Sequence, residues 1–296
     1  MSKLGTKTDG VLVFSDYKKL HNRLVYCLFV AILCIAALIS VFPPLWLFLS
    51  SFKSGVELYA VPFRLFPEKM DLQKVVDVWE TLSFGRYYLN SLWVVTGAVF
   101  SAVLFNGLLA YGVAVLKPAG HKVVTALIMA SLMIPPILNM GPLFHNIVRL
   151  NLIDSYLPLW LVFGANPFYF LIFKSYFDRL PKSLFEAAQL DGCTNVQLFT
   201  RITIPLSLPI TMVVAIFTMN AAWSDFLLPF LVLRSDGKQT VMVKIYSLQS
   251  ALGMLQGFGP DKLLMVLALS ILPPIALFLL FQKEITSSVM TTGLKE

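Results

Sequence analysis

The chain has 296 residues, of which 57% are hydrophobic and 13% are charged, and its formal net charge is +7. Soluble domains carry about 25% charged residues, so this composition argues against a soluble protein and favours an integral membrane protein surrounded by membrane lipid. The Lys and Arg residues are spread over short loops and do not form a basic, aromatic-rich surface, which argues against a nucleic-acid partner.

The N-terminal part of the chain is predicted to hold one membrane helix between two polar segments. Residues 1–23 are a basic cytoplasmic tail, expected to end in a short interfacial helix. Residues 24–52 form the first apolar run, which is long enough to cross a bilayer and too long for a signal-peptide core. Residues 53–88 carry charges of both signs and predict an extracytoplasmic loop with a short helix around residues 72–82.

Residues 89–282 are predicted to form a transmembrane core of five further helices, and residues 283–296 a cytoplasmic C-terminal tail. The five helices are expected at residues 89–116, 123–142, 156–177, 206–233 and 263–282. Prolines remove a backbone donor and clash with the preceding turn, so they should kink or interrupt helices in a bilayer. The expected positions are Pro43-Pro44, Pro135-Pro136 and Asn166-Pro167.

Six membrane helices place both chain ends on the same side of the membrane. Thirteen of the 23 Lys and Arg residues fall on that side, including those of the tail before the first helix. Because basic residues near helix ends favour the cytoplasmic side, both termini are predicted to be cytoplasmic. The predicted fold class is an all-α integral membrane protein with six transmembrane helices.

The cysteines and histidines suggest neither a disulfide nor a metal site. Cys27 and Cys34 are seven residues apart on one predicted helix, roughly 10 Å of rise, which is too far for a disulfide. Cys193 lies in a polar stretch, and the three histidines are scattered along the chain.

That polar stretch, residues 178–205, interrupts an otherwise apolar chain and is here called the knob. Pro181 suits the start of a short helix, and Gly192, which lacks a Cβ, suits the reversal at its end. Residues 195–204 predict a second short helix, with Asp191 as its candidate N-cap. Two short helices joined at a glycine would protrude on the side of the chain ends.

The spacing within the knob resembles the cytoplasmic coupling loop of ATP-binding-cassette (ABC) importer permeases. That motif reads Glu-Ala-Ala, three residues, Gly, nine residues, Ile, one residue and Leu-Pro, and every spacing is matched, with Ile204 in place of Leu. The resemblance implies the type I ABC importer permease fold and a loop that docks on a separate ATPase. The residues implied in coupling are Glu186, Ala187, Ala188, Asp191, Gly192, Ile202 and Pro205.

The chain has no Gly-rich loop ending in Gly-Lys-Ser or Gly-Lys-Thr, so it is not expected to bind nucleotide in that way. We assign it no catalytic residue and no cofactor, and do not predict an enzyme. The resemblance implies that ATP and Mg are bound by a dimer of partner ATPase subunits. Six helices in a ~30 Å slab do not enclose a wide path, so a second, homologous permease subunit is also expected.

Asn220, Trp223 and Asp225 are candidates for the substrate path. An ionisable residue inside a membrane helix is costly unless it faces the bundle interior or a water-filled path, which makes Asp225 a functional candidate. An aromatic face beside a carboxylate and an amide suits the C–H faces and hydroxyls of a sugar. This segment resembles the Trp-Asn-Glu/Asp-Phe signature of sugar-type permeases, with Ser224 in place of Asn. The alternative role for Asp225 is a structural hydrogen bond at a subunit interface or a gate.

Residues 255–261 predict a compact outer loop shaped by glycines and a proline. In maltose-type importers the corresponding loop reaches an extracytoplasmic solute-binding protein, so the resemblance implies Gln256 and Phe258 as contacts. An ordinary connector is the alternative.

The order of features resembles most the smaller permease of the maltose-type, carbohydrate-uptake branch. The predicted function is therefore a permease subunit, in the cell (inner, cytoplasmic) membrane, of an ATP-driven importer for a sugar or oligosaccharide. Alternatives are a permease for glycerol phosphate or a peptide, an ion-coupled secondary transporter and a membrane-embedded enzyme. The enzyme would need clustered His, Asp or Glu residues within helices, of which the predicted helices offer essentially one, Asp225. The secondary transporter would need several intramembrane carboxylates or broken helices in matched halves, and it would leave the knob unexplained.

Overall fold

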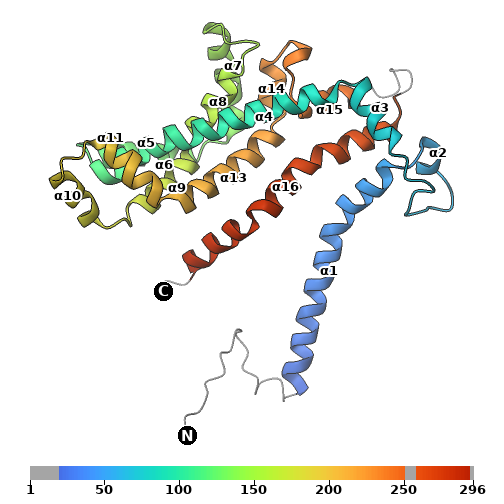
Figure 1. The fold of residues 1–296 in the computed structure, drawn as a ribbon, viewed down its shortest axis with the longest axis horizontal. Coiled ribbons are helices and arrows are strands. Elements are labelled where there is room, and N and C mark those ends of the chain that lie inside the picture. The colour runs from blue at the N-terminus through green and yellow to red at the C-terminus, as the bar shows by residue number, and fades with distance from the viewer. Residues whose placement is uncertain (1–19, 251–257, 294–296) are drawn as a thin grey trace. The chain divides into compact units, whose positions relative to one another are not determined.

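The computed structural model describes residues 20–250 and 258–293, and side chains within residues 22–250 and 258–282 (Figure 1). Every regular element in these ranges is a helix. The chain divides into two units, residues 1–70 and 71–296. The division lies within the predicted outer loop at residues 53–88.

The first unit contains the long helix α1 (Leu20–Ser51) and the short helix α2 (Gly55–Leu58). Pro43 and Pro44 lie inside α1, which continues through them instead of ending there. A capping box starts α2: the Ser54 N–H donates to Glu57 Oε2 at 2.7 Å, and the Glu57 N–H donates to Ser54 Oγ at 3.3 Å.

The second unit begins with α3 (Gln73–Thr81), which confirms the short helix predicted around residues 72–82. Val78 packs inward from α3, and Lys74 Nζ lies 3.0 Å from Asp261 Oδ2 at the start of α16 (Pro260–Gly293). This partly buried ion pair fixes the short helix beside the last long one.

One helical span follows from residue 84 to residue 116. It comprises α4 (Phe84–Ser101), η2 (Ala102–Asn106), α5 (Gly107–Tyr111) and η3 (Gly112–Leu116). Small residues allow close helix approach. The clearest instance is Gly97, where a Cβ would lie 2.2 Å from Cε2 of Trp160. The span begins at Phe84, earlier than the predicted residue 89, because aromatic residues before Asn90 pack inward: Phe84 and Tyr87 are buried.

Two spans are broken at prolines, as the sequence predicts. Helices α6 (His121–Ser131), η4 (Pro136–Asn139) and α7 (Met140–Arg149) form a pair bent by 99°. Helices α8 (Leu157–Gly164) and α9 (Pro167–Phe177) meet at 42°. The second break is closed by the buried Asn106, whose Nδ2 donates to the Phe163 carbonyl at 2.9 Å and whose Oδ1 accepts the Asn166 N–H at 3.0 Å. Backbone groups freed inside a bilayer need such partners.

The remaining helices lead from the knob to the C-terminal helix. They are α10 (Lys182–Leu190), α11 (Asn195–Gln197), η5 (Leu198–Thr203), α12 (Ile204–Leu206), α13 (Leu208–Ser224), α14 (Leu227–Val232), η6 (Asp236–Lys238) and α15 (Val241–Ser250), followed by α16. Within the described residues, three helices are long and apolar enough to cross a membrane. A third bent pair, Asn195–Leu206 with Leu208–Ser224 at 80°, brings the number of spans to as many as six if each bent pair counts as one.

The predicted helix over residues 206–233 is not continuous. It ends at Ser224, and Asp225 has an extended backbone with φ −68° and ψ 123°. The Asp225 carboxylate faces the backbone N–H groups of Leu227 and Leu228 at the start of α14. A short acceptor side chain that binds nearby backbone donors competes with helix continuation, which accounts for the break.

Two apolar clusters hold the second unit together. One gathers rings and small residues from α5, α9, α10 and η5 around Phe173, and the other joins α4, α7, α8 and α14 around Leu159. The first cluster lies at the knob end of the unit, and the second lies toward the opposite end (Figure 1).

Candidate coupling and transport sites

The first knob helix, α10, starts and ends as its sequence predicts. Pro181 is its N-cap residue, and Gly192 follows its end with φ +82°. The Cys193 N–H donates to the Ala188 carbonyl at 3.0 Å, and the Gly192 N–H donates to the Gln189 carbonyl at 3.0 Å. These two bonds form a Schellman motif, which needs a left-handed residue at the Gly192 position. The reversal is therefore held by backbone geometry and is not a loose loop.

The second knob helix is capped by Thr194, which corrects the prediction that Asp191 would cap it. The Gln197 N–H donates to Thr194 Oγ1 at 3.3 Å, and the Thr194 N–H donates to Gln197 Oε1 at 2.8 Å. Asp191 is instead the C-cap residue of α10. The signal was present in the sequence, because Thr-x-x-Gln is the spacing of a capping box.

The inner side of the knob packs on membrane helices through rings and aliphatic side chains. Phe185, Leu198 and Phe199 are buried in the first apolar cluster, and Ile202 and Ile204 pack against it. The Phe199 ring lies 5.3 Å from the ring of Tyr111, a residue of α5. Ala188 and Cys193 also pack against this cluster. Burial of this extent makes the knob a rigid projection of the α5–α9 region.

The outer side of the knob combines exposed carboxylates with exposed apolar side chains. Glu186 and Asp191 are exposed, and among the described residues neither carboxylate has a hydrogen bond or ion pair. Leu190, which directly precedes Asp191, is 89% exposed, and Val196 on the second knob helix is 71% exposed. Exposed apolar residues rimmed by charge are typical of a surface that binds another protein. Sequence reasoning missed both residues.

The other predicted coupling residues divide between the two sides. Ala187, Gly192 and Pro205 are exposed, whereas Ala188 and Ile202 are half-buried and face the apolar cluster. The knob thus presents Ala187 and Gly192 outward beside the carboxylates, while Ile202 anchors the second helix.

The three predicted path residues have different environments. Trp223 is 2% exposed; its Nε1 donates to the Ser270 carbonyl at 3.1 Å, and its ring lies 5.4 Å from that of Tyr88. Trp223 therefore ties α13 to α16 and α4 and presents no open face. Asn220 is exposed and Asp225 is half-buried at the helix break.

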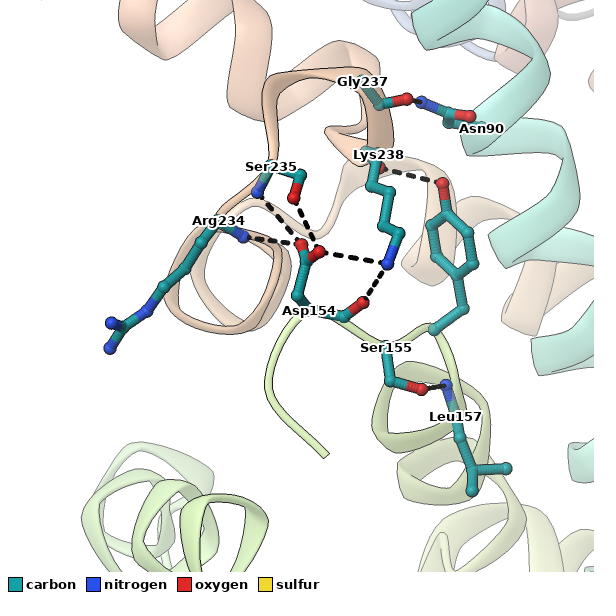
Figure 2. A network of polar contacts seen from close by, with 9 residues as sticks. Asn90, Asp154, Ser155, Leu157, Arg234, Ser235, Gly237 and Lys238 are labelled. Carbon is teal, nitrogen blue, oxygen red and sulfur yellow. Dashed lines mark hydrogen bonds and ion pairs between the residues drawn. The ribbon is translucent and has the colours of Figure 1, made fainter. Parts of the chain in front are cut away.

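A polar network, missed by the sequence reasoning, closes the end of the second unit opposite the knob (Figure 2). The Asp154 carboxylate accepts the backbone N–H groups of Arg234 and Ser235 at 3.1 and 3.0 Å and the Ser235 hydroxyl at 2.6 Å. Lys238 Nζ lies 3.0 Å from Asp154 Oδ2 and donates to the Asp154 carbonyl at 2.6 Å. The hydrogen bonds from Ser235, together with Lys238, lower the pKa of Asp154 to about 2.

A second carboxylate extends this network to α4 and α15. Tyr87 donates its hydroxyl to Asp236 Oδ2 at 2.8 Å, and Lys244 Nζ lies 3.1 Å from Asp236 Oδ1. The Tyr87 hydrogen bond, with the Lys244 ammonium, lowers the pKa of Asp236. Asn90 Nδ2 donates to the carbonyls of Gly237 and Gln239, each at 2.9 Å. This set of contacts around Asp154 and Asp236 is here called the outer clamp.

Of the two predicted binding-protein contacts, the structure describes only Phe258. Gln256 lies outside the described residues, and Phe258 is 8% exposed, whereas the prediction required an exposed ring. Within the described residues, no group of three or more His, Cys, Asp or Glu side chains is placed to hold a metal ion. Cys27, Cys34 and Cys193 are free.

Comparison with known proteins supports the transport assignment. The family model described as "Binding-protein-dependent transport system inner membrane component" matches residues 103–290. The chain is 32% identical over 262 residues to the arabinooligosaccharides transport system permease protein AraQ of Bacillus subtilis, covering 88% of this chain and 92% of that protein. It is 30% identical to the trehalose/maltose transport system permease protein MalG of Thermococcus litoralis, covering 88% and 93%.

Similar relationships extend to other systems and to a solved structure. The diacetylchitobiose uptake system permease protein NgcG of Streptomyces coelicolor is 29% identical over 261 residues, covering 88% of this chain and 85% of that protein. A chain in the crystal structure of a bacterial ABC transporter involved in the import of the acidic polysaccharide alginate superposes with a TM-score of 0.79 at 22% identity, covering 90% and 98%.

These comparisons confirm the predicted ABC importer permease fold and the predicted family, whose members are transport components and not enzymes. The chain belongs to the family of inner membrane components of binding-protein-dependent transport systems.

Proposed function

We propose that this chain is one of two permease subunits of an ATP-driven importer for a sugar or oligosaccharide, and that its knob transmits the movement of a separate ATPase. The observation that carries the proposal is the two-sided knob: a buried apolar side seated on α5 and α9, and an outer side with the exposed carboxylates of Glu186 and Asp191. Such a rigid projection can pass a partner's rotation to membrane helices, whereas a loose loop would absorb it.

Energy would come from the partner. ATP and Mg would be bound by a dimer of ATPase subunits, and the knob would lie in a cleft on that dimer. Leu190 and Val196 would supply apolar contact, and Glu186 would pair with a basic residue of the ATPase. Both termini and the knob would be cytoplasmic, because thirteen of the 23 basic residues fall on that side.

The substrate class is supported by the relatives, whose names describe transport of arabinooligosaccharides, trehalose or maltose, and diacetylchitobiose. In this chain Asn220 and Asp225 would face the path, with the Asp225 break setting its carboxylate apart from α13. Trp223 would act by positioning α13 against α16. A second permease subunit would supply the other half of the path, and an extracytoplasmic solute-binding protein would deliver the sugar.

The test is charge reversal at Glu186 in the assembled transporter. Glu186→Lys should abolish uptake of radiolabelled oligosaccharide and reduce co-purification of the ATPase subunits, while the permease stays in the membrane. Glu80→Lys is the matched control, because Glu80 is an exposed helix residue outside the knob. Normal uptake by the Glu186 variant would remove the coupling role.

A further inference from the structure

An open groove between α6 and α9 lies beside the knob and has no part in the proposed coupling. Its lining comes from the end of η3, from α6 and from the last turns of α9. Two adjoining hollows, each of about 340 Å³, share Thr125, Met129, Lys174 and Asp178. The spans at residues 84–116 and 157–177 both end here, so the groove lies at a membrane boundary. Its combined size exceeds that of a small inorganic anion.

One end of this groove is strongly cationic. Lys117, Lys122, Lys174 and Arg179 line it with a single carboxylate, Asp178, which leaves 4 − 1 = +3 charges. Lys174 Nζ is occupied by Asp178 Oδ2 at 2.6 Å. Among the described side chains, no carboxylate forms an ion pair with Lys117, Lys122 or Arg179. Three cations therefore face the groove without a partner carboxylate in that part of the chain.

The other end of the groove is apolar. Met129 and Leu171 line it, and outside the groove lining α6 also exposes apolar side chains, including Val123 and Leu127. No residue of α6 is buried by the rest of the described chain. The lining of the groove thus changes from cationic at one end to apolar at the other. This arrangement matches a ligand that carries an anionic group joined to an apolar chain.

The connector before α6 supports a role for the lysine side chain at its start. Lys117 has φ +48°, a left-handed conformation that is unfavourable for a residue with a Cβ. Glycine adopts this conformation without that penalty and is the usual residue after a helix end. Backbone geometry alone would therefore favour glycine at position 117, whereas the chain has a residue whose ammonium lines the groove.

We propose that the groove binds the headgroup of an anionic phospholipid such as phosphatidylglycerol from the adjoining leaflet. Its phosphate would lie among Lys117, Lys122 and Arg179, and one acyl chain would follow Met129 along α6. Basic pockets between membrane helices on the cytoplasmic side suit such headgroups. Inorganic phosphate shares the anionic chemistry but makes no use of the apolar end.

The experiment is lipid binding by the purified, fully assembled transporter, followed by native mass spectrometry with added phosphatidylglycerol or phosphatidylcholine. The wild type should retain phosphatidylglycerol in preference to phosphatidylcholine. Each of Lys117→Gln and Lys122→Gln should weaken phosphatidylglycerol binding about fivefold, the equivalent of about 1 kcal/mol per basic residue. Lys117→Arg should keep the preference.

The controls separate this site from general charge effects. Lys69→Gln with Arg149→Gln removes two exposed cations outside the groove and should leave binding unchanged. A photoactivatable phosphatidylglycerol should label α6 or α9 in the wild type. Absence of a lipid preference in the wild type, labelling confined to other helices, protection of the groove by another subunit, or displacement of the lipid by inorganic phosphate would each overturn the proposal.

Discussion

The knob and the outer clamp lie at opposite ends of the second unit and are stabilised by opposite means (Figure 1). In the knob, rings such as Phe185 and Phe199 hold two short helices on α5 and α9, and the carboxylates are left exposed. In the outer clamp, Asp154 and Asp236 are committed to hydrogen bonds and ion pairs within the chain. The same residue type is thus without a partner within the described chain at one end and committed to internal contacts at the other.

The difference separates carboxylates that are already bonded within the chain from carboxylates that could bind a partner. A carboxylate that already accepts four hydrogen bonds, as Asp154 does, has little capacity left for a partner. Glu186 has no such commitments among the described residues. Apolar anchoring of the knob leaves its polar surface free of contacts within the described chain, which suits the proposed docking on an ATPase.

The largest expected effect is at the base of the knob. Phe199→Ala removes a buried ring, and such truncations typically cost 3–5 kcal/mol, so the knob helices should detach from the membrane helices. Hydrogen–deuterium exchange of residues 185–204 in the assembled transporter should rise, while exchange around the outer clamp stays unchanged. Phe199→Leu, which keeps most of the volume, should have a much smaller effect. Unchanged exchange in the alanine variant would show that the ring does not hold the knob.

A smaller loss is expected at the outer clamp. Asp154→Ala removes the acceptor for two backbone N–H groups, one hydroxyl and one ammonium, which should destabilise the unit by about 2 kcal/mol. Chemical denaturation in detergent, followed by tryptophan fluorescence, measures the loss. Asp191→Ala is the matched control, since it removes an exposed carboxylate from the knob and should change stability by less than about 0.5 kcal/mol. Equal losses of stability in the two variants would contradict the proposed difference between the outer clamp and the knob.

These two ends also differ in how far sequence alone could predict them. The knob is local: Pro181 and Gly192 bound one helix, and a Thr-x-x-Gln capping box starts the next, so neighbours along the chain determine the structure. The outer clamp joins Asp154 to Ser235, which are 81 positions apart, and no local pattern links them. From the sequence, a charged loop containing Asp154 could be predicted, but the residues that bond to Asp154 could not.

Prolines illustrate the same limit. The prediction placed an interruption at Pro135-Pro136 and noted Asn166-Pro167 in the middle of a helix; the chain bends at both sites, by 99° and 42°. Pro43 and Pro44 lie within a helix that continues. Local sequence indicates where a donor is missing, but the packing partners decide whether the helix breaks there and how far it bends. Asn106 is one such partner, and its only signal was a polar residue within an apolar run.

The pH dependence of stability should test the contribution of the Asp154 carboxylate to the outer clamp. Because the folded-state pKa of Asp154 is lowered to about 2, its contribution to stability is present above the unfolded pKa of about 3.9 and is lost as the pH falls from there toward 2. The wild type should lose on the order of 1 kcal/mol relative to Asp154→Asn across this window, given the solvent screening of a partly exposed group. Parallel denaturation series of the two proteins test this. A constant difference between them across the window would contradict the assigned ionisation.

The smallest expected effect on stability is at Glu186, and it is the most informative. Glu186→Gln should change the free energy of unfolding by less than about 0.5 kcal/mol, because the carboxylate has no partner among the described residues. Coupled transport should nevertheless fall, since the amide cannot form an ion pair with the ATPase. Denaturation and uptake measured on the same preparation separate the two quantities. A stability loss as large as that of Asp154→Ala would mean that Glu186 is a structural residue, and that the two ends use their carboxylates alike.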